Sequence, residues 1–201
     1  TNRDARAAGA SDHGAAPDDA AAGAVAAGTT SAAGTIPAAG EAAESTTLAL
    51  TGAYHPLVPR AVPNTVTIMR PGAIVTGTNM AGKSTFLRTV GINVLFAQTA
   101  GYAFAKGYQA PRMRIMSSIE KHDDLEEGKS FYYDEAERIF LMIEEVGETT
   151  PVLLLIDELL SGTNSLERES ASIAILHYLA ERPALTIAAT HDVTIARGVQ
   201  D

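Results

Sequence analysis

A glycine-bearing loop carries the clearest chemical signal in this sequence. Residues 77–84 read Gly-Thr-Asn-Met-Ala-Gly-Lys-Ser and match the pattern G-x-x-x-x-G-K-[ST] at every fixed position. Glycines allow backbone N–H groups to surround phosphate oxygens, and the positive end of a following helix points at the same place. Lys83 can reach the β- and γ-phosphates, and the Ser84 hydroxyl can ligate Mg²⁺. The loop therefore predicts a nucleotide site; the alternative is a chance glycine loop that caps a helix.

A second candidate is an apolar run that ends in two acids. Residues 152–156 read Val-Leu-Leu-Leu-Ile and are followed by Asp157 and Glu158. In P-loop NTPases a carboxylate at such a strand tip holds Mg²⁺, so Asp157 is placed for that role. Glu158 lies one residue further on, where it can polarise an attacking water. The alternative is a strand that ends in solvated acids, and the phosphate loop upstream favours the functional interpretation.

A third candidate is His191, which follows the predicted strand 184–189 and Thr190. A histidine at the tip of a core strand can contact a γ-phosphate and stabilise the charge that develops there. From this residue alone, the more common outcome is a neutral surface histidine with no role.

The elements that must position these residues alternate between strands and helices. Residues 65–69 alternate in polarity as a strand does, and 70–72 form a turn. Helical periodicity is clearest over 134–146, where apolar residues recur at spacings of three and four. Such alternation predicts an α/β fold with a largely parallel central sheet flanked by helices. The further predicted strands are 73–76, 112–116, 152–156 and 184–189, and the further predicted helices are 83–98 and 165–181.

Composition divides the chain into two parts. Of the first 40 residues, 16 are Ala and 6 are Gly, and no aromatic residue precedes Tyr54. A segment with so little to bury cannot offset the entropy of ordering, so we expect a disordered tail over 1–47 and a folded domain over 48–201. The formal net charge is −9 and no basic face is evident, so we do not expect this chain to hold DNA by itself.

Two further features concern the compartment. The chain has no cysteine, which excludes a disulfide scaffold and fits a reducing environment. No apolar run approaches the ~18 residues needed to cross a bilayer. We therefore expect a cytoplasmic protein that does not associate with a membrane.

Four stretches, in order and spacing, resemble the ATPase domain of MutS-family DNA mismatch repair proteins, which are relatives of the ABC superfamily of P-loop ATPases. They are residues 76–85, 123–130, 157–165 and 189–191. The Asn-Met pair inside the phosphate loop is far more specific than the general loop pattern. His55-Pro56 and Val62-Pro63-Asn64 also resemble the start of that domain, so the resemblance covers about residues 50–195.

The resemblance implies a Mg²⁺-dependent ATPase of the P-loop NTPase fold. It implies that Ser84 and Asp157 hold the metal, that Glu158 is the general base and that His191 senses the γ-phosphate. Ser130 matches the signature serine, which in this family reaches the nucleotide bound by the other subunit; by itself it would read as a helix N-cap. The residues thereby assigned to ATP are Gly77, Thr78, Asn79, Met80, Ala81, Gly82, Lys83, Ser84, Thr85 and Ser130.

The same resemblance implies a partner, either a second copy or another MutS-like subunit, across a shared nucleotide site. Family members carry other domains before the ATPase and reach DNA through them; this chain has only the Ala/Gly tail there. Members also continue past the histidine, so we expect a domain truncated at its C-terminal end. The aromatic residue that stacks on adenine is missing near Ala61, and Tyr54 or His55 could replace it.

Three functions remain open at this point. The first is an ATP hydrolase that acts in DNA mismatch repair or in related repair and recombination. The second is a nucleotide-binding switch with little turnover. The third is another ABC-type ATPase of DNA maintenance, against which the Asn-Met phosphate loop and the Ser-Gly-Thr-Asn stretch at 161–164 argue.

Overall fold

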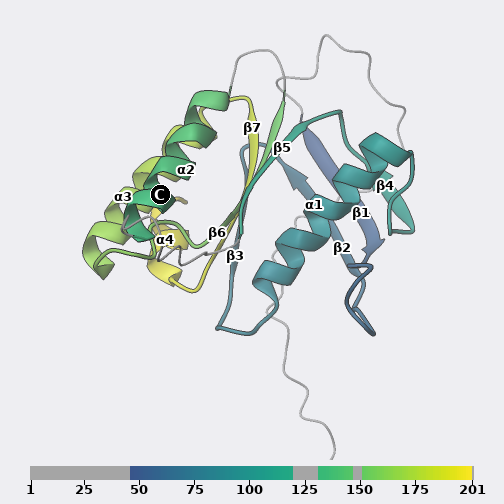
Figure 1. The fold of residues 1–201 in the computed structure, drawn as a ribbon, viewed down its shortest axis with the longest axis horizontal. Coiled ribbons are helices and arrows are strands. Elements are labelled where there is room, and N and C mark those ends of the chain that lie inside the picture. Colours follow the sequence, from purple (N-terminus) through teal and green to yellow (C-terminus); the bar gives the residue numbers. More distant parts are fainter. Residues whose placement is uncertain (1–45, 120–130, 147–150, 201) are drawn as a thin grey trace, which may run out of the picture.

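The computed structural model describes residues 46–119, 131–146 and 151–200 of the 201-residue chain. Two sheets and one long helix organise these residues (Figure 1). The elements in chain order are β1 (Thr47–Ala53), β2 (Asn64–Met69), β3 (Gly72–Thr76), α1 (Lys83–Ala100), β4 (Gly107–Gln109), β5 (Arg114–Ser118), α2 (Phe131–Glu145), β6 (Val152–Asp157), α3 (Ser165–Ala180), β7 (Ala184–Thr190) and α4 (Val193–Gly198).

A four-stranded parallel sheet has the order β3-β7-β6-β5. Its register pairs Thr76 with Thr190, and Asp157 with Ala189. Parallel strands that end in register deliver the segments after them to one edge of the sheet, which is where ligands bind in open α/β sheets. The loop after β3 and the acids at the end of β6 therefore meet at the same edge.

The two central strands are apolar on both faces because both faces are covered. Every residue of β7 is buried, as are the first five residues of β6. Leu153 and Leu155 belong to a core shared with α1 and the antiparallel sheet. Leu154 and Ile156 belong to a second core, shared with α2, α3 and α4. Burial on both faces explains the continuous apolar run of β6 and the largely apolar sequence of β7, which are typical of parallel sheets.

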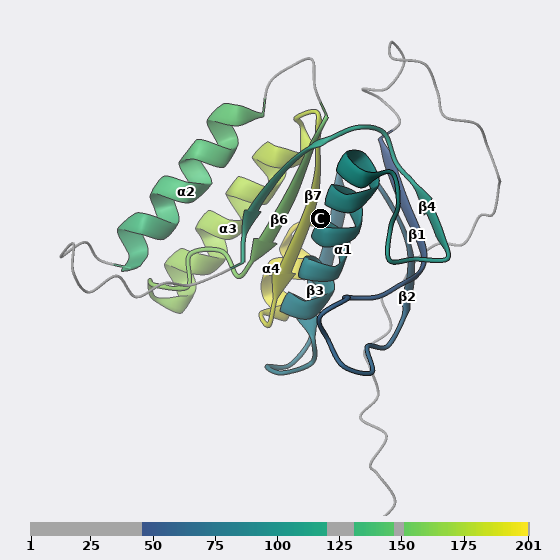
Figure 2. The same cartoon turned by 45° about the vertical axis from the view of Figure 1, so that its right-hand side comes forward.

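Helix α1 lies between the two sheets, and the other three helices cover the far face of the parallel sheet (Figures 1 and 2). Leu87, Val90 and Val94 of α1 are at most 1% exposed and face the first core. A Cβ added at Gly91 would lie 2.8 Å from Leu155 Cδ1, so a side chain there would force either Leu155 or α1 to shift. Close packing thus fixes where the first turn of α1 lies relative to the end of β6.

The structure confirms the parallel sheet flanked by helices but adds a second sheet that the sequence did not predict. Strands β2, β1 and β4 pair antiparallel in that order, so the predicted strand 65–69 lies outside the parallel sheet. β1, the three-residue β4 and the six-residue α4 were not predicted. β5 begins at Arg114 rather than at residue 112, and β1 begins at Thr47, the last residue assigned to the tail.

No helix among the described residues is long and apolar enough to span a membrane.

Gly72 tests the contact between β3 and β7. Its φ is +144°, and a Cβ there would lie 1.8 Å from the Thr186 carbonyl oxygen. Gly72→Ala should therefore lower the free energy of unfolding by about 3 kcal/mol, from backbone strain and overpacking together. Gly101→Ala is the matched control, since φ there is +74° and nothing lies within 4 Å; it should cost about 1 kcal/mol. If urea unfolding shows that Gly72→Ala and Gly101→Ala lower the free energy of unfolding by the same amount, this explanation is wrong.

Candidate active site

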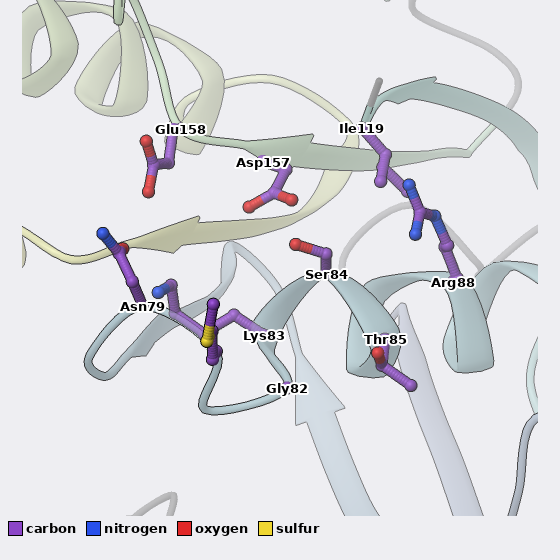
Figure 3. Close-up of a pocket in the computed structure, with 10 residues that line it drawn as sticks. Asn79, Gly82, Lys83, Ser84, Thr85, Arg88, Ile119, Asp157 and Glu158 are labelled. Atoms are coloured by element: carbon purple, nitrogen blue, oxygen red, sulfur yellow. The ribbon is translucent and has the colours of Figure 1, made fainter. Parts of the chain in front are cut away.

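One cavity of about 670 Å³ lies at the edge where β3, β6 and β7 end. Its walls come from the loop after β3, the first turns of α1 and the ends of β5 and β6 (Figure 3). The lining residues are Asn79, Met80, Gly82, Lys83, Ser84, Thr85, Arg88, Ile119, Asp157 and Glu158. Its volume is in the range of sites that hold a cofactor or nucleotide-sized ligand.

The loop at 77–82 turns sharply into α1 through two residues with a left-handed backbone conformation. Gly82 is the N-cap residue with φ +89°, and Met80 has φ +68°. No side chain caps the helix, and its first turn carries no acidic residue. The first N–H groups of a helix need partners, and the macrodipole favours an anion there. This helix start can therefore accept a phosphate group.

Lys83 lies beneath the loop and holds it together. The residue is only 9% exposed. Its Nζ donates hydrogen bonds to the carbonyl oxygens of Gly77, at 2.9 Å, and Thr78, at 3.1 Å. The ammonium group is thus fixed at the cavity wall by two neutral acceptors, with no carboxylate among these contacts to neutralise it. A fixed, desolvated cation of this kind attracts anionic oxygens strongly.

Ser84 and Asp157 face one another across the cavity, one from α1 and one from the end of β6 (Figure 3). The described part of the chain holds no group of three or more His, Asp or Glu side chains arranged for a metal ion. A hydroxyl and a single carboxylate suit Mg²⁺, which usually takes one or two protein carboxylates together with water and phosphate oxygens. A cation held by these two groups would complete its shell with water and with the phosphate oxygens of a bound ligand.

Glu158 adopts an unusual backbone conformation at the rim of the cavity. Its φ is +59°, in the left-handed region. Its N–H donates to the Ala189 carbonyl oxygen at 2.9 Å, and its Oε1 lies 2.8 Å from His191 Nδ1. A carboxylate can only accept, so His191 Nδ1 carries the proton in this hydrogen bond. The pair joins the ends of β6 and β7 beside the cavity.

His191 is supported by the residues on either side. Thr190 Oγ1 accepts a hydrogen bond from the Asp192 N–H at 3.0 Å. Asp192 caps α4 by accepting from the Thr194 N–H at 3.0 Å, and Arg168 of α3 lies 3.6 Å from its other oxygen. The Thr194 hydroxyl, with the Thr194 N–H and Arg168, holds the pKa of Asp192 below its usual value.

Comparison with known proteins identifies the family of this chain. A family profile described as MutS domain V matches residues 73–200, which is more than half of the chain and includes every residue that lines the cavity. The chain belongs to the MutS family.

Relatives of this MutS-family chain come from distant organisms. It is 37% identical over 148 residues to the DNA mismatch repair protein MutS of Thermus aquaticus, covering 72% of this chain and 18% of that protein. It is 37% identical over 142 residues to Endonuclease MutS2 of Thermus thermophilus, covering 69% and 19%. It is 33% identical over 154 residues to human MutS protein homolog 4, covering 72% and 16%. The chain thus spans less than a fifth of the length of these relatives.

The structure brings together most of the residues singled out from the MutS-like sequence. Six residues of the stretch 77–85, from the loop and the first turn of α1, line the cavity with Asp157 and Glu158, and His191 contacts Glu158. Gly77, Thr78 and Ala81 belong to the same loop but are not among the lining residues. Ser130, with the rest of the stretch 123–130, lies outside the described residues.

The two residues considered as replacements for the adenine-stacking aromatic, Tyr54 and His55, do not line this cavity. The Tyr54 ring packs edge-on against the Phe104 ring, with 6.0 Å between the ring centroids. The backbone N–H of Tyr54 donates a hydrogen bond to the Phe104 carbonyl oxygen at 2.9 Å. His55 Nδ1 accepts from the Leu57 N–H at 3.3 Å.

Two lining residues were missed from the sequence, Arg88 and Ile119. Arg88 lies four residues after Ser84 on α1, and residues four apart share a face of a helix. That spacing could have identified Arg88 as a second cation beside the cavity. Ile119 follows the end of β5, and no pattern marked it.

Asp192 allows a test of how the His191 segment is held. Asp192→Ala removes the cap of α4 and should lower the free energy of unfolding by about 1 kcal/mol at pH 7. The pKa of Asp192 is lower in the folded chain than its ordinary value of 3.8. Its stabilisation is therefore present above that ordinary value and disappears as pH falls through the lower folded value. Urea unfolding at pH 7, 5 and 3 measures the difference in free energy of unfolding between wild type and Asp192→Ala. That difference should shrink only at pH 3.

Asp192→Asn is the matched control, because asparagine caps helices as well as aspartate does but does not titrate. It should stay close to wild type at pH 7. An advantage of wild type over Asp192→Ala that is the same at pH 3 and pH 7 would contradict the assignment.

Proposed function

We propose that this chain binds ATP with Mg²⁺ and hydrolyses it, as the P-loop ATPase domain of a protein that acts in DNA mismatch repair or related repair and recombination. One observation carries the proposal. A single cavity is lined by the start of a helix with Lys83 and Ser84 on one side, and by Asp157 and Glu158 on the other. These are the groups that a triphosphate, a divalent cation and an attacking water each require.

The triphosphate fits the phosphate-loop side of the cavity. The uncapped N–H groups at the start of α1 and the Lys83 ammonium would bind the β- and γ-phosphate oxygens. Mg²⁺, when bound, would supply positive charge that offsets the charge developing on the phosphate oxygens. The Ser84 hydroxyl and the Asp157 carboxylate would hold it. Asn79, whose side chain points from the loop toward Glu158 in Figure 3, would bind a further phosphate oxygen.

Glu158 would orient the attacking water and accept its proton. The bond from the water oxygen to the γ-phosphorus forms while the bond from that phosphorus to the β–γ bridging oxygen breaks, and ADP carries that oxygen away. The His191 side chain is 42% exposed and lies 2.8 Å from Glu158, so it can place that carboxylate and reach the γ-phosphate from the open side. Hydrogen-bond donors aimed at developing charge are the main contribution of such a site.

The role in DNA repair and the partner come from the family rather than from this cavity. The Thermus aquaticus relative is named a DNA mismatch repair protein, and the other two are named Endonuclease MutS2 and MutS protein homolog 4. This chain matches less than a fifth of the length of each. With a net charge of −9, the chain is poorly suited to bind DNA phosphates directly. We therefore assign DNA contact to other parts of the full protein, and assign Ser130 to the nucleotide of a second MutS-like subunit.

Two substitutions test the two sides of the cavity. Lys83→Ala should weaken ATP binding by about 100-fold, because a buried cation that pairs with phosphate is lost. Glu158→Gln should leave ATP binding intact while turnover falls by about 10²- to 10⁴-fold, because the general base is removed. A fluorescent ATP analogue reports binding, and release of inorganic phosphate reports turnover.

Lys106→Ala and Glu181→Gln are the controls, since both residues are exposed and neither lines the cavity. Unchanged affinity in Lys83→Ala would remove the phosphate-binding role of the loop. Normal turnover in Glu158→Gln would remove this residue from the mechanism. A wild-type chain that binds ATP but never releases phosphate would identify a nucleotide switch instead.

A further inference from the structure

A buried carboxylate outside the cavity contacts the turn that carries Glu158. Glu135 of α2 is only 7% exposed, and its Oε2 accepts a hydrogen bond from Ser161 Oγ at 3.3 Å. Ser161 lies three residues after Glu158, in the segment between β6 and α3. Glutamate is rarely buried unless it is paired. The proposed ATPase chemistry gives this side chain no role, so its burial needs another explanation.

The turn itself is conformationally demanding. Both Glu158 and Leu160 have positive φ, at +59° and +53°. A left-handed backbone at a residue other than glycine costs about 1–2 kcal/mol, and it persists only where the surroundings determine it. Two such residues within three positions mean that the path of the chain after Asp157 depends on its contacts with other elements.

Contacts from three directions hold the turn. From β7, the Ala189 carbonyl oxygen accepts from the Glu158 N–H at 2.9 Å. From α3, the buried Ser172 hydroxyl donates to the Leu159 carbonyl oxygen at 3.5 Å. From α2, Glu135 accepts from Ser161. The side chains at 159 and 160 are 5% exposed and share a core with residues of α2 and α3.

We infer that Glu135 is a positioning residue for Glu158, and that it acts through Ser161 to hold the turn after β6 in its left-handed conformation. The inference rests on the proposed function for the role of Glu158, but the geometric link does not depend on nucleotide. The Ser161 hydrogen bond anchors the far end of the turn, whereas the Ala189 hydrogen bond anchors its beginning. Without the hydrogen bond to α2, the turn loses a contact that helps to keep Leu160 at positive φ, and the backbone there can change conformation more easily.

Loss of this anchor should affect turnover and binding differently. Displacement of a catalytic group by about 1 Å can cost ~10²-fold in rate, so kcat should fall by about 10- to 100-fold in Glu135→Ala and in Ser161→Ala. ATP affinity should stay within about twofold of wild type, because neither Glu135 nor Ser161 lines the cavity. Glu135→Gln keeps an oxygen that can accept from Ser161, so it should restore turnover to near the wild-type rate.

Amide hydrogen exchange, followed by mass spectrometry on the full chain without nucleotide, measures the turn itself. A peptide covering residues 157–163 should exchange faster in Glu135→Ala and Ser161→Ala than in wild type, and at the wild-type rate in Glu135→Gln. Peptides from β6 should be unchanged, which separates loss of the anchor from loss of the fold. The controls are Glu144→Ala and Ser170→Ala, exposed residues of α2 and α3 that should leave both exchange and turnover unaltered.

Unchanged exchange at 157–163 in Ser161→Ala would overturn the inference, and so would normal kcat in a folded Glu135→Ala chain. If Glu135→Ala fails to fold, Ser161→Ala decides, since it removes only the donor. A wild-type chain that binds no ATP would refute the proposed function, and the exchange measurement would still accept or reject the positioning role on its own.

Discussion

The parallel register of β3, β7 and β6 is the constraint on which the candidate site depends. Because Thr76 pairs with Thr190 and Asp157 pairs with Ala189, the loop at 77–82, the acids Asp157 and Glu158, and His191 all leave the sheet at the same edge. The residues concerned lie far apart in the sequence. A slip of one residue in this register would turn the core residues of β6 toward the wrong face, and it would also separate the carboxylates from the loop.

Unusual backbone conformations direct the chain at this edge of the sheet. Met80 and Gly82 turn the loop into α1, and Glu158 and Leu160 turn the chain out of β6, all with positive φ. Such strain is tolerated where surrounding contacts determine the conformation, and it concentrates at functional sites. Here the contacts are Lys83 beneath the loop and the hydrogen bonds from β7, α3 and α2 around the acidic turn.

The parts of the fold that could be predicted are those with long apolar runs or regular periodicity. β6 is buried on both faces and was evident as an uninterrupted apolar run, β7 was evident as a largely apolar segment interrupted by Thr186, and α1 followed from the loop that begins it. β4 could not be predicted in this way, because its three residues form a strand only by pairing with β1. The antiparallel sheet depends on such non-local pairing, and so its existence was missed.

The site shows the same division between local and non-local information. Lys83, Ser84 and Asp157 were identified from motifs that are local in the sequence, and they do lie on one cavity. The hydrogen bond from His191 to Glu158 joins residues 33 positions apart, and that from Ser161 to Glu135 joins residues 26 apart. Neither contact has a local signature, because each depends on how the strands and α2 pack together.

The most direct test of this account is a crystal structure of the chain with a non-hydrolysable ATP analogue and Mn²⁺ in place of Mg²⁺. The anomalous signal of manganese locates the metal independently of the protein. We predict a manganese peak between Ser84 Oγ and the Asp157 carboxylate, with the β- and γ-phosphates enclosed by residues 77–83. Manganese bound away from both side chains, or phosphates bound outside that loop, would contradict the central claim.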